Sequence, residues 1–113
     1  MSHTWKYQTD KPLTFSPKRV AEKITYGFDF INVINSGEAI SSSSWTIMAV
    51  RPSTVATTDM LTGSGTVEGT KTFHRIQSGT HNTIYCITAE IITDLGNVYA
   101  ENALLNVTDD CYI

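Results

Sequence analysis

Residues 23–49, KITYGFDFINVINSGEAISSSSWTIMA, contain the clearest structural signal in this chain. From Ile24 to Phe30 apolar residues alternate with small or polar ones, which is typical of an extended segment with one apolar face. Asn35-Ser36-Gly37 follows with turn chemistry, because glycine takes a positive φ at no steric cost. In the next extended run, Trp45 and Ile47 share a face. We therefore predict two β-strands that pair as a hairpin around this turn.

The second extended run contains a change of phase. Ile40 and Trp45 are separated by an odd number of positions, and the run Ser41–Ser44 lies between them. One extra residue in a strand, a β-bulge, would return both apolar side chains to the same face. We predict a bulge in this stretch, with the serine hydroxyls on an exposed strand face.

The last third of the chain indicates a second hairpin. Residues 83–93 and 98–107 each have one apolar face, and Asp94-Leu95-Gly96-Asn97 joins them. Two alternating runs around a short polar turn with glycine predict antiparallel pairing. The apolar positions that share a face in these runs are Tyr85, Ile87, Ala89, Ile91, Tyr99, Ala103, Leu105 and Val107.

The chain as a whole favours an all-β fold. No stretch shows a long 3.6-residue period, and about seven short runs are separated by turn residues, including a plausible strand at 70–77. This pattern predicts an immunoglobulin-like antiparallel β-sandwich over residues 22–108, with an N-terminal arm at 1–21 and a tail at 109–113. The predicted core is Tyr26, Phe28, Phe30, Trp45, Ile47, Tyr85, Ile87, Ile91 and Leu105.

Composition narrows the classes of function. The chain has 113 residues, of which 41% are hydrophobic and 17% charged, as expected for one globular domain. A net charge of −3 and eight scattered basic residues argue against nucleic-acid binding. The N-terminus lacks the apolar core of a signal peptide, and no apolar run approaches the ~20 residues of a membrane span. We expect a soluble protein made in a cytoplasm.

Residues that could carry chemistry do not form a recognisable site. The histidines, His3, His74 and His81, are not spaced as metal ligands, and we expect His74 to be exposed or half-exposed in a strand. Cys86 and Cys111 are too few for a disulfide scaffold, so we interpret Cys86 as a buried small hydrophobe and both as free thiols. We predict no catalytic residue, no metal and no cofactor, and hence no enzyme.

The arm carries large apolar residues in a segment with little local support. Leu13-Thr14-Phe15 could add an edge strand, limited in length by Pro12 and Pro17. Trp5 and Tyr7 either fold back onto their own domain or anchor the arm to a neighbouring subunit, since aromatic anchors are typical of interface hot spots. We predict that Trp5, Tyr7 and Phe15 form the interface with the neighbour.

Several short motifs follow one another in an order that resembles a known family. Tyr26-x-Phe28-Asp29-Phe30, Ser36-Gly37-Glu38-x-Ile40 and Ser43-Ser44-Trp45-Thr46 are similar to motifs of small tailed-bacteriophage proteins, the fibre–tail adaptors and related immunoglobulin-like virion proteins. Residues 83–96 resemble the start of the family's final hairpin, and the likeness spans about residues 17–107. The chain departs from the family at Ser78-Gly79-Thr80-His81, where members often have paired glycines, and in its two ends.

The resemblance implies a structural virion protein of the tail or neck, or a fibre–tail adaptor. Its partners would be other phage structural proteins of the tail, neck or capsid, with a homo-oligomer in the particle and no nucleic acid or membrane. A capsid decoration or cement protein is a second reading. A carbohydrate-binding surface module is a third, and it requires Trp45 to be exposed.

Overall fold

The structure is a computed structural model, and it describes residues 13–109. This part of the chain is all-β, as predicted. It has six strands rather than about seven: β1 (Ile24–Asp29), β2 (Ile40–Arg51), β3 (Leu61–Glu68), β4 (Lys71–Ile76), β5 (Thr83–Thr93) and β6 (Val98–Val107).

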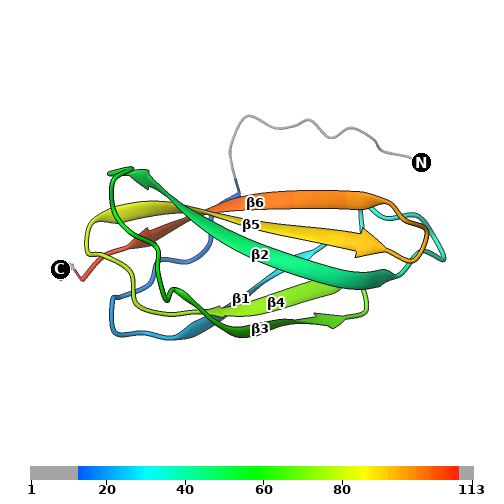
Figure 1. Ribbon diagram of the computed structural model, residues 1–113, viewed down its shortest axis with the longest axis horizontal. Helices are drawn as coiled ribbons and strands as arrows, with labels where there is room; N and C mark the ends of the chain where they lie inside the picture. Colours follow the sequence, from blue (N-terminus) through cyan, green and yellow to red (C-terminus); the bar gives the residue numbers. More distant parts are fainter. Residues whose placement is uncertain (1–12, 110–113) are drawn as a thin grey trace.

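The six strands form two antiparallel sheets that face each other. One sheet has the order β1-β4-β3 and the other the order β2-β5-β6. Figure 1 shows them as two layers, with β2, β5 and β6 above β1, β4 and β3. The predicted antiparallel sandwich is therefore confirmed, and each sheet has one inner face and one outer face.

The prediction that the first two strands pair as a hairpin is wrong. β1 pairs with β4, and β2 pairs with β5 in the opposite sheet. Gly37 has the positive φ of 86° that the turn requires, but the segment 30–39 crosses between the sheets. The two apolar faces meet across the core instead, with the rings of Phe28 and Trp45 5.3 Å apart. In this arrangement each strand buries its apolar face against the other sheet.

The predicted bulge in the second run is confirmed. The register between β2 and β5 shifts between Ile40 and Ser42. After the shift, Trp45 and Ala49 are buried, while Thr46 and Met48 lie on the outer face. A second shift lies between Ala49 and Arg51, near the end of the strand.

The predicted second hairpin is also confirmed. β5 and β6 pair continuously from Thr83 opposite Val107 to Ile92 opposite Val98. Gly96 in the connecting turn has a φ of 85°, and the Thr93 carbonyl accepts a hydrogen bond from its N–H at 2.9 Å.

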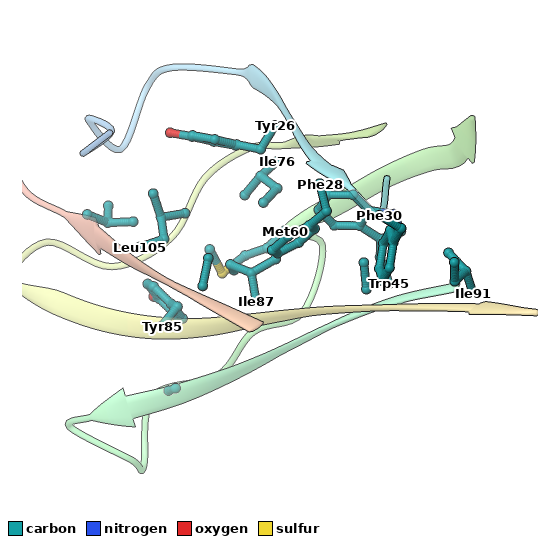
Figure 2. Close-up of a cluster of buried hydrophobic side chains, with 14 residues drawn as sticks. Tyr26, Phe28, Phe30, Trp45, Met60, Ile76, Tyr85, Ile87, Ile91 and Leu105 are labelled. Carbon is teal, nitrogen blue, oxygen red and sulfur yellow. The ribbon is translucent and has the colours of Figure 1, made fainter. Parts of the chain in front are cut away.

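Apolar side chains from both sheets fill the space between the layers (Figure 2). Of the predicted core residues all but Ile47 are buried, and Ile47 is half-buried and packs against the cluster. The indole Nε1 of Trp45 donates a hydrogen bond to Thr72 Oγ1 on β4 at 3.0 Å, and Thr72 in turn donates to Ser43 Oγ at 2.9 Å. This chain of side chains joins the two sheets. The buried hydrophobic residues are Tyr26, Phe28, Phe30, Trp45, Ala49, Met60, Ile76, Tyr85, Ile87, Ala89, Ile91, Ala103, Leu105 and Val107.

Residues 13–18 run parallel to β6 along its free edge. Leu104 accepts a hydrogen bond from the N–H of Phe15 and donates one to the carbonyl of Leu13, both at 2.9 Å. Lys18 pairs with Val107 further along. The edge strand expected at Leu13-Thr14-Phe15 is reduced to one isolated parallel bridge at Thr14; a second bridge at Lys18 lies beyond Pro17, and the two together cover the edge of β6.

Candidate interaction surfaces

Phe15 contacts its own domain. Its ring stacks on Tyr26 with centroids 4.6 Å apart and lies 5.1 Å from Phe28. The hydroxyl of Tyr26 donates a hydrogen bond to the carbonyl of Ser16 at 3.0 Å. Burial, with a smaller effect from the charge of Glu22, raises the pKa of Tyr26 to about 12. The last part of the N-terminal segment is therefore fixed to the sandwich by aromatic packing and by a hydrogen bond.

The buried side chain of Lys18 holds the same segment through hydrogen bonds. Only 1% of its surface is exposed, and its ammonium donates hydrogen bonds to the carbonyls of Arg19, Val20 and Ser78. Burial lowers the pKa of Lys18, while the charges of Glu22 and Asp109 oppose this shift. Since Ser78 belongs to the loop between β4 and β5, the lysine ties the N-terminal segment to the connection between the two sheets.

Glu38 plays a similar part at the opposite end of the sandwich. It is buried, and its carboxylate accepts hydrogen bonds from the hydroxyl of Thr93, the backbone N–H of Asn35 and the amide of Asn97. The bond from Thr93 is the largest cause of a lowered pKa of Glu38; Asn35, Asn97 and Tyr99 add to it, and burial opposes it. The carboxylate thereby fastens the turn before β2 to the β5–β6 turn. Sequence reasoning did not find Lys18 or Glu38, because no local pattern marks a buried charge whose partners are distant.

The outer face of the β2-β5-β6 sheet has a contiguous apolar area, which we call the outer patch. Met48 lies opposite Cys86 in the register, and Cys86 lies opposite Leu104. Met48 is 63% exposed and Val50 44% exposed, and the other members are half-buried. The outer patch consists of Met48, Ile84, Cys86 and Leu104, together with Val50 at the register shift that follows Met48, and the polar Arg51 and Asn106 lie on the two sides of Ile84.

The position of Cys86 corrects the prediction that it is buried. Tyr85 and Ile87 both point into the core, so the alternation of the strand places Cys86 on the outer face. It is the free cysteine of the described residues.

A polar row borders the outer patch. Thr46, Thr88 and Asn102 lie opposite one another on the three strands. Thr88 Oγ1 donates a hydrogen bond to Asn102 Oδ1 at 2.7 Å. The apolar area therefore has a defined limit on the side toward the start of β6.

The outer face of the β1-β4-β3 sheet is organised around Phe73. This residue points outward over Gly27, where an added Cβ would lie 2.5 Å from its ring. Shallow hollows of about 330 and 270 Å³ lie on its two sides, lined in part by Arg75 and by Lys71.

The outward position of Phe73 reverses the expectation for His74. His74 points inward, is 7% exposed and lies 5.7 Å from the Trp45 ring. The prediction of an exposed or half-exposed histidine is wrong, because Thr72, His74 and Ile76 form the inner face of this strand.

The predicted chemical residues do not come together in one place. Within residues 13–109, no three His, Cys, Asp or Glu side chains are grouped as metal ligands would be. His81 lies in the loop before β5, where its Nδ1 accepts a hydrogen bond from the backbone N–H of Asp109 at 2.9 Å. Trp45, which the carbohydrate-binding reading requires at the surface, is only 7% exposed. The same part of the chain has no helix long and apolar enough to cross a membrane.

Of the predicted interface residues, the structure places only Phe15. Trp5 and Tyr7, together with His3 and Cys111, lie outside the described residues. The predicted limits of the arm at residue 21 and of the tail at residue 109 stay predictions.

Comparison with known proteins adds one finding. The family model of the podophage GP4 fiber-tail adaptor protein gp77 matches residues 18–106. The match begins at the buried Lys18 and ends one residue before the end of β6, so it includes the pairing of both sheets. Comparison with curated proteins gave no match.

Proposed function

Since the chain belongs to the podophage fiber-tail adaptor family, a family of structural virion proteins, we propose that it joins tail and fibre through protein–protein contacts. The family match over residues 18–106 is the observation that carries this proposal, because it covers nearly the whole sandwich. The coarser reading from the sequence, a structural phage protein of the tail, is confirmed by the same match.

The partners in this proposal are the tail and fibre proteins of the same particle, together with further copies of this chain. A connector needs separate surfaces for its neighbours, and the sandwich offers two outer faces of different chemistry. One is the apolar outer patch, and the other combines Phe73 with the exposed Lys71 and Arg75. A contiguous exposed apolar area is typical of a contact with another protein.

The N-terminal arm supplies the anchors in this proposal. Phe15 stacks on Tyr26 of its own chain, which fixes the base of the arm to the sandwich. Trp5 and Tyr7 are then the aromatic residues with which the arm contacts a neighbouring subunit. The protein would be made in the host cytoplasm and would act without catalysis, nucleic acid or membrane, which agrees with its net charge of −3.

A deletion of this gene from the phage genome tests the proposal. We expect particles with normal heads and tails that lack fibres, as seen by electron microscopy. Expression of the intact chain from a plasmid should restore the fibres, which serves as the control. Particles that keep a full set of fibres without this chain would refute the adaptor role.

A further inference from the structure

We propose that the outer patch is the docking site for residues 1–12 of a second copy of this chain. The inference rests on the proposed assembly through protein contacts, and it names the surface and the segment that meet. It requires that the patch be a contact surface, that residues 1–12 suit it, and that a neighbour provide them.

The outer patch has the properties of a contact surface. Met48, Cys86 and Leu104 form one row across three adjacent strands. In the next row Ile84 lies between Arg51 and Asn106, and the exposed Val50 lies beside it at the register shift of β2. The most exposed members, Met48 and Val50, keep 63% and 44% of their surface accessible. One face of an antiparallel sheet commonly faces water and then carries polar residues. This apolar row departs from that pattern, and the adjacent row of Thr46, Thr88 and Asn102 follows it.

Residues 1–12 fit this surface in composition and in place. They include Trp5 and Tyr7, whose rings bury large apolar areas on a protein surface. Residues 1–12 join the sandwich at Leu13, whose carbonyl accepts a hydrogen bond from Leu104, a member of the patch. An extended segment of this length reaches up to about 40 Å, enough to bridge neighbouring subunits.

The direction of the chain at Leu13 favours a neighbour over the same subunit. Thr14 pairs with Leu104 and Lys18 with Val107, both in parallel orientation. Followed backward from Lys18 to Leu13, the chain therefore runs toward the start of β6 and the polar row at Asn102. A segment of the same copy would have to reverse its direction to place Trp5 on the patch, whereas a neighbouring copy can be oriented so that its segment crosses the patch directly.

The β6 edge gives a further reason for docking on the face. Residues 13–18 already occupy this edge through backbone hydrogen bonds. A second extended segment cannot pair at this edge, so a segment that reaches Leu104 has to use side-chain contacts with the sheet face. Two aromatic anchors against an apolar area would provide such contacts.

Cys86 provides the reporter for a test on the full-length protein. The experiment uses Cys111→Ser, which leaves Cys86 as the one thiol of the chain, and follows its modification by a maleimide. We expect modification at high protein concentration to be at least tenfold slower than at high dilution. The double variant Trp5→Ala/Tyr7→Ala should react at the fast rate at every concentration. The matched control Lys6→Ala/Gln8→Ala should behave as the parent protein.

Disulfide trapping identifies the donor of the segment. We expect Trp5→Cys, combined with Cys111→Ser, to form covalent dimers and larger species with Cys86 under mild oxidation. As a control, Cys86→Ser/Thr66→Cys in the same background moves the target thiol to the other sheet and should give little cross-linking. Monomers with an internal disulfide, or protection of Cys86 that does not depend on concentration, would show that the same chain covers the patch and would overturn the proposal.

The proposal would also be overturned if Cys86 reacted with the maleimide at the fast rate at every protein concentration. Because these measurements use purified protein, they are independent of the gene deletion. Fibreless particles together with an unprotected Cys86 would leave the adaptor role standing and remove only this docking site.

Discussion

Thr72 gives the sharpest test of how the two sheets are joined. Its side chain is fully buried, accepts a hydrogen bond from Trp45 Nε1 and donates one to Ser43 Oγ. Thr72→Val keeps the shape of the side chain and its suitability for a strand but removes the hydroxyl. The indole N–H of Trp45, which is 7% exposed, would then lose its partner in the core.

The expected loss follows from burial. A buried donor left without a partner costs about 1–3 kcal/mol, whereas an ordinary hydrogen bond contributes about 1 kcal/mol net. Ser43 is half-buried, so its hydroxyl can bond to water after the substitution. We therefore expect Thr72→Val to reduce the free energy of unfolding by about 2 kcal/mol. For a domain of this size, that reduction lowers the Tm by about 10 °C.

The assay is urea unfolding followed by circular dichroism, in a double-mutant cycle with Trp45→Phe. In the Trp45→Phe background the N–H is absent, and Thr72→Val should then cost about 1 kcal/mol less than in the parent protein. The control is Thr46→Val, an exposed position on the outer face of β2, where we expect a change within about 0.5 kcal/mol. An equal loss in both Trp45 backgrounds would refute the hydrogen-bond explanation and leave packing alone.

Three further substitutions test other parts of the structure. The pKa of Glu38 is lowered from 4.5, so its carboxylate stabilises the folded state above pH 4.5, and this stabilisation is lost as the pH falls through the folded-state pKa. In acid titrations of the free energy of unfolding, Glu38→Gln should therefore lose less stability than the parent protein. The control Glu68→Gln, at an exposed position, should lose as much as the parent. The pKa of Tyr26 is raised from 10.0 to about 12, so the folded state holds the phenol proton more tightly than the unfolded state, and stability should fall as the pH rises between these values. Tyr26→Phe should remove this fall in thermal melts at alkaline pH. The same dependence of Tm on pH in both proteins would contradict burial of the Tyr26 hydroxyl as its cause. Gly27→Ala brings a Cβ against the ring of Phe73 and should lower the free energy of unfolding by about 1 kcal/mol in urea titrations. The loss should become smaller in a Phe73→Ala background, where the Thr72 carbonyl at 3.1 Å is the remaining close contact, and a loss of the same size there would rule out the ring as its cause.

The faces of the strands could be read from the sequence, but their neighbours could not. Alternation placed Phe28, Trp45 and Tyr85 toward the interior, and the structure buries all three. The same alternation does not say which strand lies beside which. β1 pairs with β4, more than forty residues away, because two apolar faces are buried better across a sandwich than side by side.

The β4 strand shows how a residue on a distant strand decides which side chains point inward. The sequence TKTFHRI offers Phe73 and His74 as competing inner residues. Gly27 lies opposite Phe73 and leaves room for its ring on the outer face, so His74 takes the inner position beside Trp45. No signal near Phe73 could have revealed this glycine as its partner.

The candidate surface was partly within reach of the sequence. The predicted inward positions of Tyr85 and Ile87 already imply that Cys86 points outward, so the outer patch follows from a stricter use of alternation. Its continuity with Met48 and Leu104 depends on strand order and register, which only the structure provides.

The central claim, that this chain connects tail and fibre in the virion, is tested most directly by cross-linking mass spectrometry of purified phage particles. The exposed Lys23 and Lys71 offer amines for the reagent. The adaptor role predicts cross-links from this chain to a tail protein and to a fibre protein in the same particles. Cross-links to the capsid protein alone, or absence of the chain from the particles, would contradict it.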